Sequence, residues 1–200
     1  MQLSNFQSLP SFLQNATTSY SFAADQILFR QGDRSRNVLI VTNGRIKLVR
    51  STIEGRTVVL QVVNRGESLG ENTFLSDFSP YTAIAEVPSR AIAFPPALLR
   101  EALHQHPELA ADFRERLLKK IQALEVRLEL LQIRAAHQRL LQYLRYQAAA
   151  ARNQTVVVNQ PLKTVAAELY LSPRTVSRAL ARLEQNRQIS RQADAIILLD

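Results

Sequence analysis

The sequence predicts an α+β chain in which a β-rich barrel or sandwich is followed by a long helix and then by a helix-turn-helix with a small hairpin. All five glycines lie within 32–70, among short β-rich segments. The stretch 108–147 contains neither glycine nor proline, and 162–183 shows two short apolar helical patterns around a turn. A length of 200 residues and a hydrophobic fraction of 46% suit one large or two small folded domains.

The glycines divide the first part into strands and turns, because glycine reaches positive φ without a Cβ clash. Strands are expected at 38–41, 45–49, 57–63, 81–87 and 90–94. Asn43-Gly44 predicts a two-residue hairpin, and Glu54-Gly55 is a second, weaker hairpin signal. Short strands with closely spaced turns are typical of a sandwich or a barrel.

An apolar stripe runs along the long helix at spacings of three and four residues, which places its members on one face. It consists of Phe113, Leu117, Ile121, Leu124, Leu128 and Leu131. The stripe could pack on the chain's own β domain or on a second copy. Its length favours dimerisation, because paired helices bury such a seam by knobs-into-holes packing. A further helix is expected at about 136–151, either continuous with the first through a bend or separated from it near 133–136.

The segment 162–183 has the pattern of a helix-turn-helix, preceded by a loop at 152–154 and a short strand at 155–158. The turn is Tyr170-Leu171. Ser172 is a preferred N-cap residue and Pro173 suits the first helical position. The second helix carries an apolar side and, opposite to it, arginines at positions 174, 178 and 182. The segments 188–191 and 195–198 are expected to form a small hairpin, a wing.

An exposed helix start lined with arginine, threonine and serine is suited to reading the major groove of DNA. Arginine can bond guanine O6 and N7 together, and hydroxyl groups can reach bases or phosphates. The candidate DNA contacts are Ser172, Arg174, Thr175, Ser177, Arg178 and Arg182, with Lys163, Thr164 and Arg191 as weaker phosphate contacts. The alternative is an ordinary helical hairpin with a solvated arginine face.

The composition favours a polyanionic partner and gives no support for catalysis. The formal net charge is +8, with +4 in 112–145 and +3 in 152–200. The absence of cysteine excludes disulfides, thiolate nucleophiles, Cys-ligated zinc and ordinary iron–sulfur clusters. The three histidines form no metal motif and no catalytic motif is visible, so neither an enzyme nor a metal or cofactor is predicted. No signal peptide or membrane span is recognisable, and a cytoplasmic location is expected.

Taken together, these residues resemble the Crp/Fnr family of bacterial transcription regulators over about 27–200. The segments 38–48 and 55–71, the latter ending in Gly66-Glu67-Ser68-Leu69-Gly70-Glu71, look like the family's roll strands, and 171–178 looks like its recognition helix. The resemblance implies a double-stranded, jelly-roll-like β-roll at 1–107, a dimerisation helix at 108–134 and a winged helix-turn-helix at 135–200. It also implies a homodimer on pseudo-palindromic double-stranded DNA, with RNA polymerase as a partner if the protein is an activator.

The effector site departs from the pattern of the family's cyclic-nucleotide-responsive members. Gly70-Glu71 is present, but Tyr81-Thr82-Ala83 stands where those members have an Arg-Ser/Thr-Ala group that grips ribose and phosphate. A phenol cannot supply the bidentate, charge-assisted grip of arginine. The candidate pocket is Gly70, Glu71, Tyr81, Thr82, Ala83 and Leu124. We expect an unidentified effector or none, and not cAMP; the rivals are a cyclic-nucleotide sensor despite Tyr81 and a dimeric protein-interaction module.

Three residues of the DNA-binding unit also depart from the family pattern. Arg174 stands where many members have Glu, so that a hydrogen-bond donor replaces an acceptor and the preferred base shifts toward guanine. Tyr170 stands where the turn often has Gly; a positive φ there would cost about 1 kcal/mol or more. Asn186-Arg187 stands where Gly is usual before the wing, and Asn tolerates left-handed backbone better than most residues.

Overall fold

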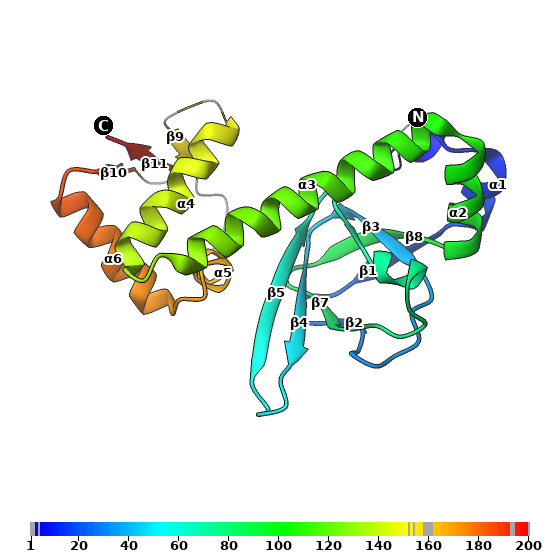
Figure 1. The fold of residues 1–200 in the computed structure, drawn as a ribbon, viewed down its shortest axis with the longest axis horizontal. Coiled ribbons are helices and arrows are strands. Elements are labelled where there is room, and N and C mark those ends of the chain that lie inside the picture. Colours follow the sequence, from blue (N-terminus) through cyan, green and yellow to red (C-terminus); the bar gives the residue numbers. More distant parts are fainter. Residues whose placement is uncertain are drawn as a thin grey trace. The chain divides into compact units, whose positions relative to one another are not determined.

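The computed structural model describes residues 3, 5–151, 153, 155–157, 162–192 and 195–199. It divides into two compact units, Met1–Lys120 and Ile121–Asp200. The boundary between them falls inside the longest helix, α3 (Pro107–Gln132), which contributes residues to both units (Figure 1). The sequence analysis instead divides the chain into three parts, with 108–134 as a dimerisation helix between the two domains.

The first unit is a β-roll with helices at both ends of its sequence. Its elements are η1 (Phe6–Ser8), α1 (Ser11–Ala16), β1 (Thr18–Phe22), β2 (Ile27–Phe29), β3 (Val38–Asn43), β4 (Arg45–Ser51), β5 (Thr57–Asn64), β6 (Ser68–Leu69), η2 (Glu71–Phe74), β7 (Thr82–Ala85), β8 (Ser89–Phe94), α2 (Pro96–Gln105) and the first part of α3. The strands form two antiparallel four-stranded sheets, in the orders β1-β8-β3-β6 and β2-β7-β4-β5. The predicted double-stranded roll is confirmed.

Strand β3 is buried on both faces, which explains its uninterrupted apolar run. Leu39 and Val41 belong to the core between the sheets, together with side chains of β4 and β7. Val38 and Ile40 point the other way, because successive side chains alternate across a strand. They pack with residues of α1, α2 and α3 in a second core. The roll is therefore closed on one side by helices that precede and follow it in the sequence (Figure 1).

The prediction of a hairpin at Asn43-Gly44 is wrong. Strands β3 and β4 lie in different sheets, and Gly44, at φ 80°, marks the point where the chain crosses between them. A Cβ at Gly44 would lie 2.3 Å from Ser89 Oγ, so this crossing also requires a close backbone approach. The Glu54-Gly55 hairpin is confirmed: β4 and β5 pair from Arg45↔Asn64 to Ser51↔Thr57.

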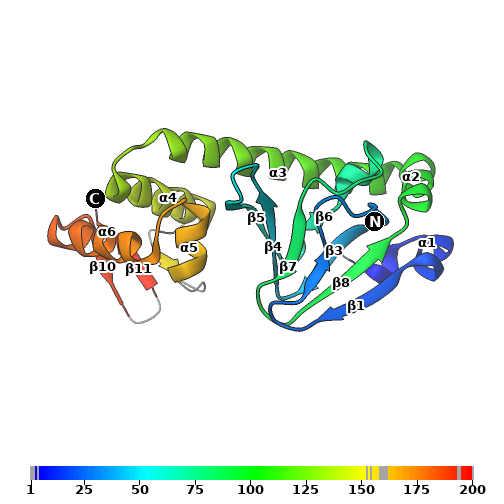
Figure 2. The same ribbon diagram turned by 90° about the horizontal axis from the view of Figure 1, so that it is seen from below.

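The second unit contains the last turns of α3 and a small helical domain with one sheet. Its other elements are α4 (Ala136–Ala151), β9 (Thr155–Val157), α5 (Leu162–Glu168), α6 (Pro173–Gln185), β10 (Ile189–Arg191) and β11 (Ala195–Leu198). The three strands form an antiparallel sheet in the order β10-β11-β9, with β10 and β11 as the predicted wing beside α6 (Figure 2). Position 158 of the predicted strand, like 152 and 154 of the predicted loop, lies outside the described residues.

The long helical stretch is two helices, because α3 ends at Gln132 and α4 begins at Ala136. The core of the second unit unites α3, α4, α5 and α6: Leu130 of α3 packs with Leu140 and Leu144 of α4 and with apolar residues of the helix-turn-helix. The joint at 133–135 therefore lies within one packed unit. Within the part of the chain that is described, no helix is both long enough and apolar enough to cross a bilayer.

Candidate DNA-binding interface and effector pocket

Helix α6 begins at a fully formed N-cap. The Ser172 hydroxyl accepts a hydrogen bond from the Thr175 backbone N–H at 3.1 Å and lies 2.8 Å from the Thr175 hydroxyl. Pro173 occupies the first helical position, where its missing N–H has no intrahelical partner to lose. The predicted cap is confirmed, and it fixes the start of the helix that carries the candidate DNA contacts.

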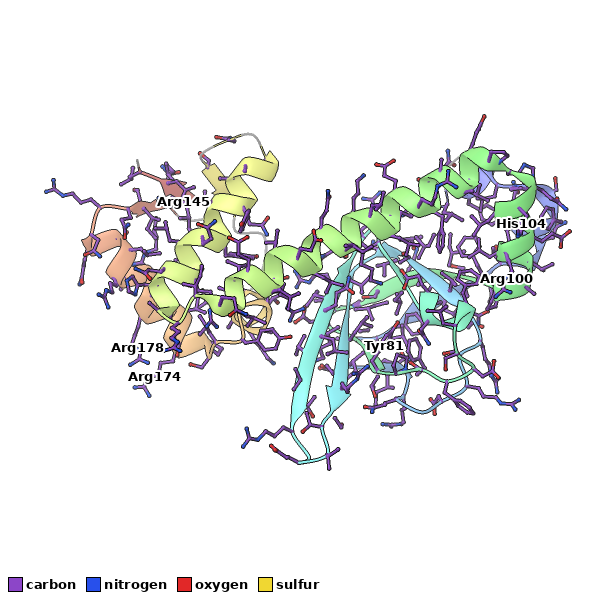
Figure 3. All side chains as sticks on the ribbon, viewed as in Figure 1. Tyr81, Arg100, His104, Arg145, Arg174 and Arg178 are labelled. Carbon is purple, nitrogen blue, oxygen red and sulfur yellow. The ribbon has the colours of Figure 1, made fainter. Side chains whose placement is uncertain are left out.

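The two sides of α6 differ sharply in burial. Val176, Ala179, Leu180 and Leu183 are buried in the core of the second unit. Arg174, Ser177, Arg178 and Arg182 are exposed. Arg174 and Arg178 project from the same side of α6 (Figure 3), and among the described residues no ion pair or side-chain hydrogen bond holds either guanidinium group. Both groups are therefore available to an anionic partner.

The weaker phosphate candidates are placed differently. Lys163 is exposed at the start of α5, whereas Thr164 is only 1% exposed. The prediction for the Thr164 side chain is corrected accordingly, because a hydroxyl buried in α5 cannot reach a phosphate. Arg191 of the wing pairs with Glu184, whose carboxylate accepts from Arg191 Nε at 2.8 Å. This hydrogen bond lowers the pKa of Glu184, and it would compete with a phosphate for Arg191.

The turn between α5 and α6 holds a strained residue. Tyr170 has φ 53°, so tyrosine occupies a conformation that favours glycine. A second such position is Arg187, at φ 54°, whereas Asn186 has φ −80°. The expectation that Asn186 would adopt the left-handed conformation before the wing is therefore wrong, and Arg187 adopts it instead.

Two arginines outside the helix-turn-helix hold its turn, and the sequence patterns did not single them out. The Arg127 guanidinium of α3 lies over the Tyr170 ring, 4.6 Å from its centroid. Arg139 of α4 donates to the carbonyls of Ile133 and Leu169, both at 2.9 Å. The joint between α3 and α4 and the turn of the helix-turn-helix therefore share one side chain. These contacts depend on how helices cross, which residue spacing does not reveal.

The apolar stripe of α3 has two different surroundings. Phe113 is buried in the helical core of the first unit, edge-on to Phe74 at 5.8 Å, and Leu117 packs against the same core. Ile121, Leu124 and Leu128 are exposed, with 63% of Leu128 accessible. Leu131 is half-buried, and Leu118, which the stripe did not include, is also exposed. The prediction that Phe113 belongs to a free seam is corrected, because its own unit covers it.

The polar residues of the roll that the sequence singled out are occupied by one another. The Tyr81 hydroxyl accepts from the Gly70 N–H at 3.0 Å and donates to Asn72 Oδ1 at 3.3 Å. Burial raises the pKa of Tyr81 to about 12. The Glu71 carboxylate accepts from Lys120 Nζ of α3, at 2.9 Å and 3.0 Å, and from Ser68 Oγ at 2.6 Å. The Tyr81 hydroxyl is thus already engaged by its own chain.

The remaining predicted pocket residues do not converge on an open site. The Thr82 hydroxyl accepts from the Gln31 N–H at 2.9 Å, and Ala83 is buried in β7. Leu124 belongs to the second unit. A cavity of about 520 Å³ is present in the first unit, and of the six predicted pocket residues only Gly70 lines it. Among the described residues, no group of three or more His, Cys, Asp or Glu side chains is arranged to hold a metal ion.

Comparison with known proteins finds relatives of the roll and of the whole chain. The profile of the cyclic nucleotide-binding domain matches residues 20–106. The transcriptional regulator LdrP of Thermus thermophilus is 26% identical over 181 residues, which cover 90% of this chain and 91% of LdrP. The chain is thus similar over most of its length to transcriptional regulators, in agreement with its resemblance to the Crp/Fnr family. The fold is similar to that of TTHB099, a CRP-family regulator from Thermus thermophilus, whose structure covers 90% of this chain and 92% of its own length with a TM-score of 0.64 at 22% identity.

Other relatives share only the roll domain. Lysophospholipase NTE1 of Chaetomium globosum is 28% identical over 102 residues, which are 50% of this chain but 7% of the lysophospholipase. The chain thus spans less than a tenth of the length of these relatives, and the match is confined to the cyclic nucleotide-binding domain. It carries no argument for lysophospholipase activity in this chain.

Proposed function

We propose that this chain is a sequence-specific, double-stranded-DNA-binding transcription regulator that acts as a homodimer. The observation that carries the proposal is α6, a capped helix whose apolar side is buried and whose exposed side presents Arg174, Ser177 and Arg178 without partners among the described residues. The relationship to LdrP, which is named as a transcriptional regulator, supports it.

The contacts follow from the chemistry of these side chains. Arg174 and Arg178 are one helical turn apart and supply the bidentate donors that suit guanine O6 and N7, or phosphate oxygens. Ser177 is exposed next to Arg178 on α6, and Lys163 and Arg182 are further exposed cations of the helix-turn-helix. Ser172 and Thr175 act mainly through the cap that positions the helix. We expect operators with guanine at the position that Arg174 reads.

A second copy of the chain is the partner that fits α3. The exposed face of Leu118, Ile121, Leu124 and Leu128 is an apolar stripe with the spacing of a helix-pairing seam. Two recognition helices related by a twofold axis would read a pseudo-palindrome with half-sites about one helical turn apart, ~34–36 Å. The protein acts by binding and not by catalysis in this proposal, in the cytoplasm, where it would also meet RNA polymerase if it activates transcription.

The proposal is tested by fluorescence anisotropy with an operator selected from random DNA. Removing both guanidinium groups in Arg174→Ala/Arg178→Ala should weaken specific binding by at least about 30-fold, since each bidentate contact is worth roughly 1–3 kcal/mol. Arg65→Ala/Arg90→Ala removes the same charge from exposed positions of the first unit and should change affinity little. Specific affinity should also fall by roughly 10³-fold between 50 and 200 mM salt if about six phosphates are contacted.

Two results would contradict the proposal. If the Arg174/Arg178 variant binds the selected operator as tightly as the control variant, α6 is not the reading element. If the unmodified chain shows no DNA affinity even at low salt, the basic unit binds a protein instead. The cyclic-nucleotide rival is checked separately by calorimetry with cAMP and cGMP, for which the engaged Tyr81 and Glu71 predict no micromolar binding.

A further inference from the structure

The cavity of the first unit adjoins the polar cluster around Tyr81, because Gly70 and Asn72, which hydrogen-bond to Tyr81, line it. It is formed by side chains of β1 and β2, by the segment 33–37 and by the start of η2. Its volume of about 520 Å³ falls within the range of ~300–1,000 Å³ that is typical of small-molecule sites. Glu71 and Tyr81 do not line it, so its occupant would meet a different set of groups from those expected for a cyclic nucleotide.

One wall of the cavity is aromatic. Tyr20 and Phe22 of β1 lie on the same face of the strand and stack at 6.1 Å with an angle of 23° between their rings. Phe29 of β2 contributes a third ring, which is itself held against Tyr81 at 5.9 Å. Tyr20 is 42% exposed, although its ring provides apolar surface. Such a wall favours a flat, aromatic ligand, because offset-stacked and edge-on ring pairs gain energy beyond the area that they bury.

Two arginines give the rest of the cavity lining a positive charge. Arg34 and Arg36 line the cavity, and among the described residues neither guanidinium group has an ion-pair or hydrogen-bond partner. Asp33 is the acidic residue that lines the cavity, and its carboxylate already accepts from the Arg30 backbone N–H at 2.7 Å. The cavity therefore carries an excess of positive charge, which an anionic ligand would neutralise.

The polar groups between these walls are already positioned. Asn72 of η2 donates through Nδ2 to Ser35 Oγ at 3.0 Å and to the Phe78 carbonyl at 3.3 Å. Its Oδ1 accepts from the Tyr81 hydroxyl. The segment with the two arginines is thus tied through Ser35 to η2, so little ordering is required when a ligand binds.

We propose that this cavity binds a small aromatic carboxylic acid, whose ring stacks on Phe22 and Phe29 while its carboxylate pairs with Arg34 and Arg36. A cyclic nucleotide fits less well, because Glu71 and Tyr81, the residues expected to meet it, do not line this cavity. If the proposed regulatory function holds, the ligand is an effector: Asn72 adjoins Glu71, which holds α3 through Lys120. Binding itself does not depend on that function.

The test is calorimetry of the full chain, without DNA, using three probes. These are 1-naphthylacetate, its neutral analogue 1-naphthylacetamide, and cAMP. The acid should bind at least roughly tenfold more tightly than the amide, since a charge-assisted contact to arginine adds about 1.5–3 kcal/mol. Arg34→Gln/Arg36→Gln should remove that preference. Arg30→Gln is the matched control, because this exposed arginine lies in the same loop, does not line the cavity, and holds Asp33 through its backbone N–H alone.

Each calorimetric result either supports or overturns the proposed site. A preference for the acid that the double variant loses and Arg30→Gln retains supports the site. Equal binding of acid and amide, an unchanged preference in the double variant, or no binding of the acid at millimolar concentration would overturn it. Tighter binding of cAMP than of the acid, in competition with it, would overturn the ligand class. Unchanged melting curves of the variants show that the fold is intact, and DNA binding is measured separately, so failure here leaves the proposed function standing.

Discussion

The contact that fixes α3 on the roll can be tested by removing one lysine. In Lys120→Ala the Glu71 carboxylate, whose side chain is 14% exposed, loses both hydrogen bonds to Lys120 Nζ and keeps Ser68 Oγ. The neighbouring Lys119→Ala removes an equal charge from the same helix, but Lys119 pairs with Glu115 at the surface, where the two side chains are 71% and 64% exposed. The pair of variants therefore differs chiefly in burial.

The expected costs differ because the two carboxylates are solvated differently. A buried acceptor that loses a charged partner costs about 1–3 kcal/mol, and the partial exposure of Glu71 places this case at about 1–2 kcal/mol. A solvent-exposed i,i+4 pair contributes about 0–0.5 kcal/mol. For a unit of this size, a difference of about 1 kcal/mol lowers the melting temperature by roughly 3–6 °C.

The assay is chemical and thermal unfolding of the full-length variants followed by circular dichroism, with Glu71→Gln completing a double-mutant cycle. We expect Lys120→Ala to unfold at clearly lower denaturant concentration than Lys119→Ala, and the cost of Lys120→Ala to shrink in the Glu71→Gln background. If the two lysine variants were equally stable, or if the cycle showed no coupling, the contact would not hold α3 on the roll and the reasoning from burial would fail.

Two further contacts make predictions of their own. Gly44→Ala should lower the free energy of unfolding by roughly 2–4 kcal/mol, because the new Cβ combines a positive φ with an overlap at Ser89. Gly55→Ala should lower it by only about 1 kcal/mol, because Gly55 has φ 75° but nothing within 4 Å of an added Cβ. Equal unfolding midpoints of the two variants would refute the close approach at Gly44. Arg127→Ala and Tyr170→Ala should show a coupling energy of about 0.5–1 kcal/mol in a double-mutant unfolding cycle, because the Arg127 guanidinium stacks on the Tyr170 ring. If the two effects are additive, the contact contributes nothing to the stability of the turn.

Much of the roll could be predicted from glycine positions and apolar runs, but its sheet pairing could not. Both Asn43-Gly44 and Glu54-Gly55 are turns, yet only the second joins paired strands, because Asn43-Gly44 joins strands that belong to different sheets. Strand β1 carries Thr, Ser and Tyr and is almost entirely exposed, so it lacked an apolar alternation to reveal it. The aromatic wall of the cavity was missed for the same reason, since Tyr20 and Phe22 belong to that strand.

The helix-turn-helix was predicted more completely, because its signals are local. A cap such as Ser172-Pro173 and a turn at Tyr170 depend on residues close in sequence, and both were confirmed. The support from Arg127 and Arg139 comes from 30 or more residues away and depends on helix crossing, which periodicity does not encode. Likewise, the helical spacing of the α3 stripe could not reveal that Phe113 is covered by its own unit while Leu118, which the stripe omitted, is exposed.

The exposed part of that stripe separates dimerisation from folding. Leu124 and Leu128 are 43% and 63% exposed in a single chain, so Leu124→Glu/Leu128→Glu removes little packing from either unit and should leave the unfolding midpoint within about 0.5 kcal/mol. Burying two carboxylates in an apolar helix seam is costly, so sedimentation equilibrium should show monomers where the unmodified chain is dimeric. The control is Leu130→Ala, whose side chain is 5% exposed and packs in the core of the second unit; it should cost about 2–4 kcal/mol of stability while the folded fraction still dimerises. If the glutamate variant remains dimeric at all concentrations, the dimer interface does not lie on this face of α3. The half-site spacing proposed for the operator would then lose its structural basis.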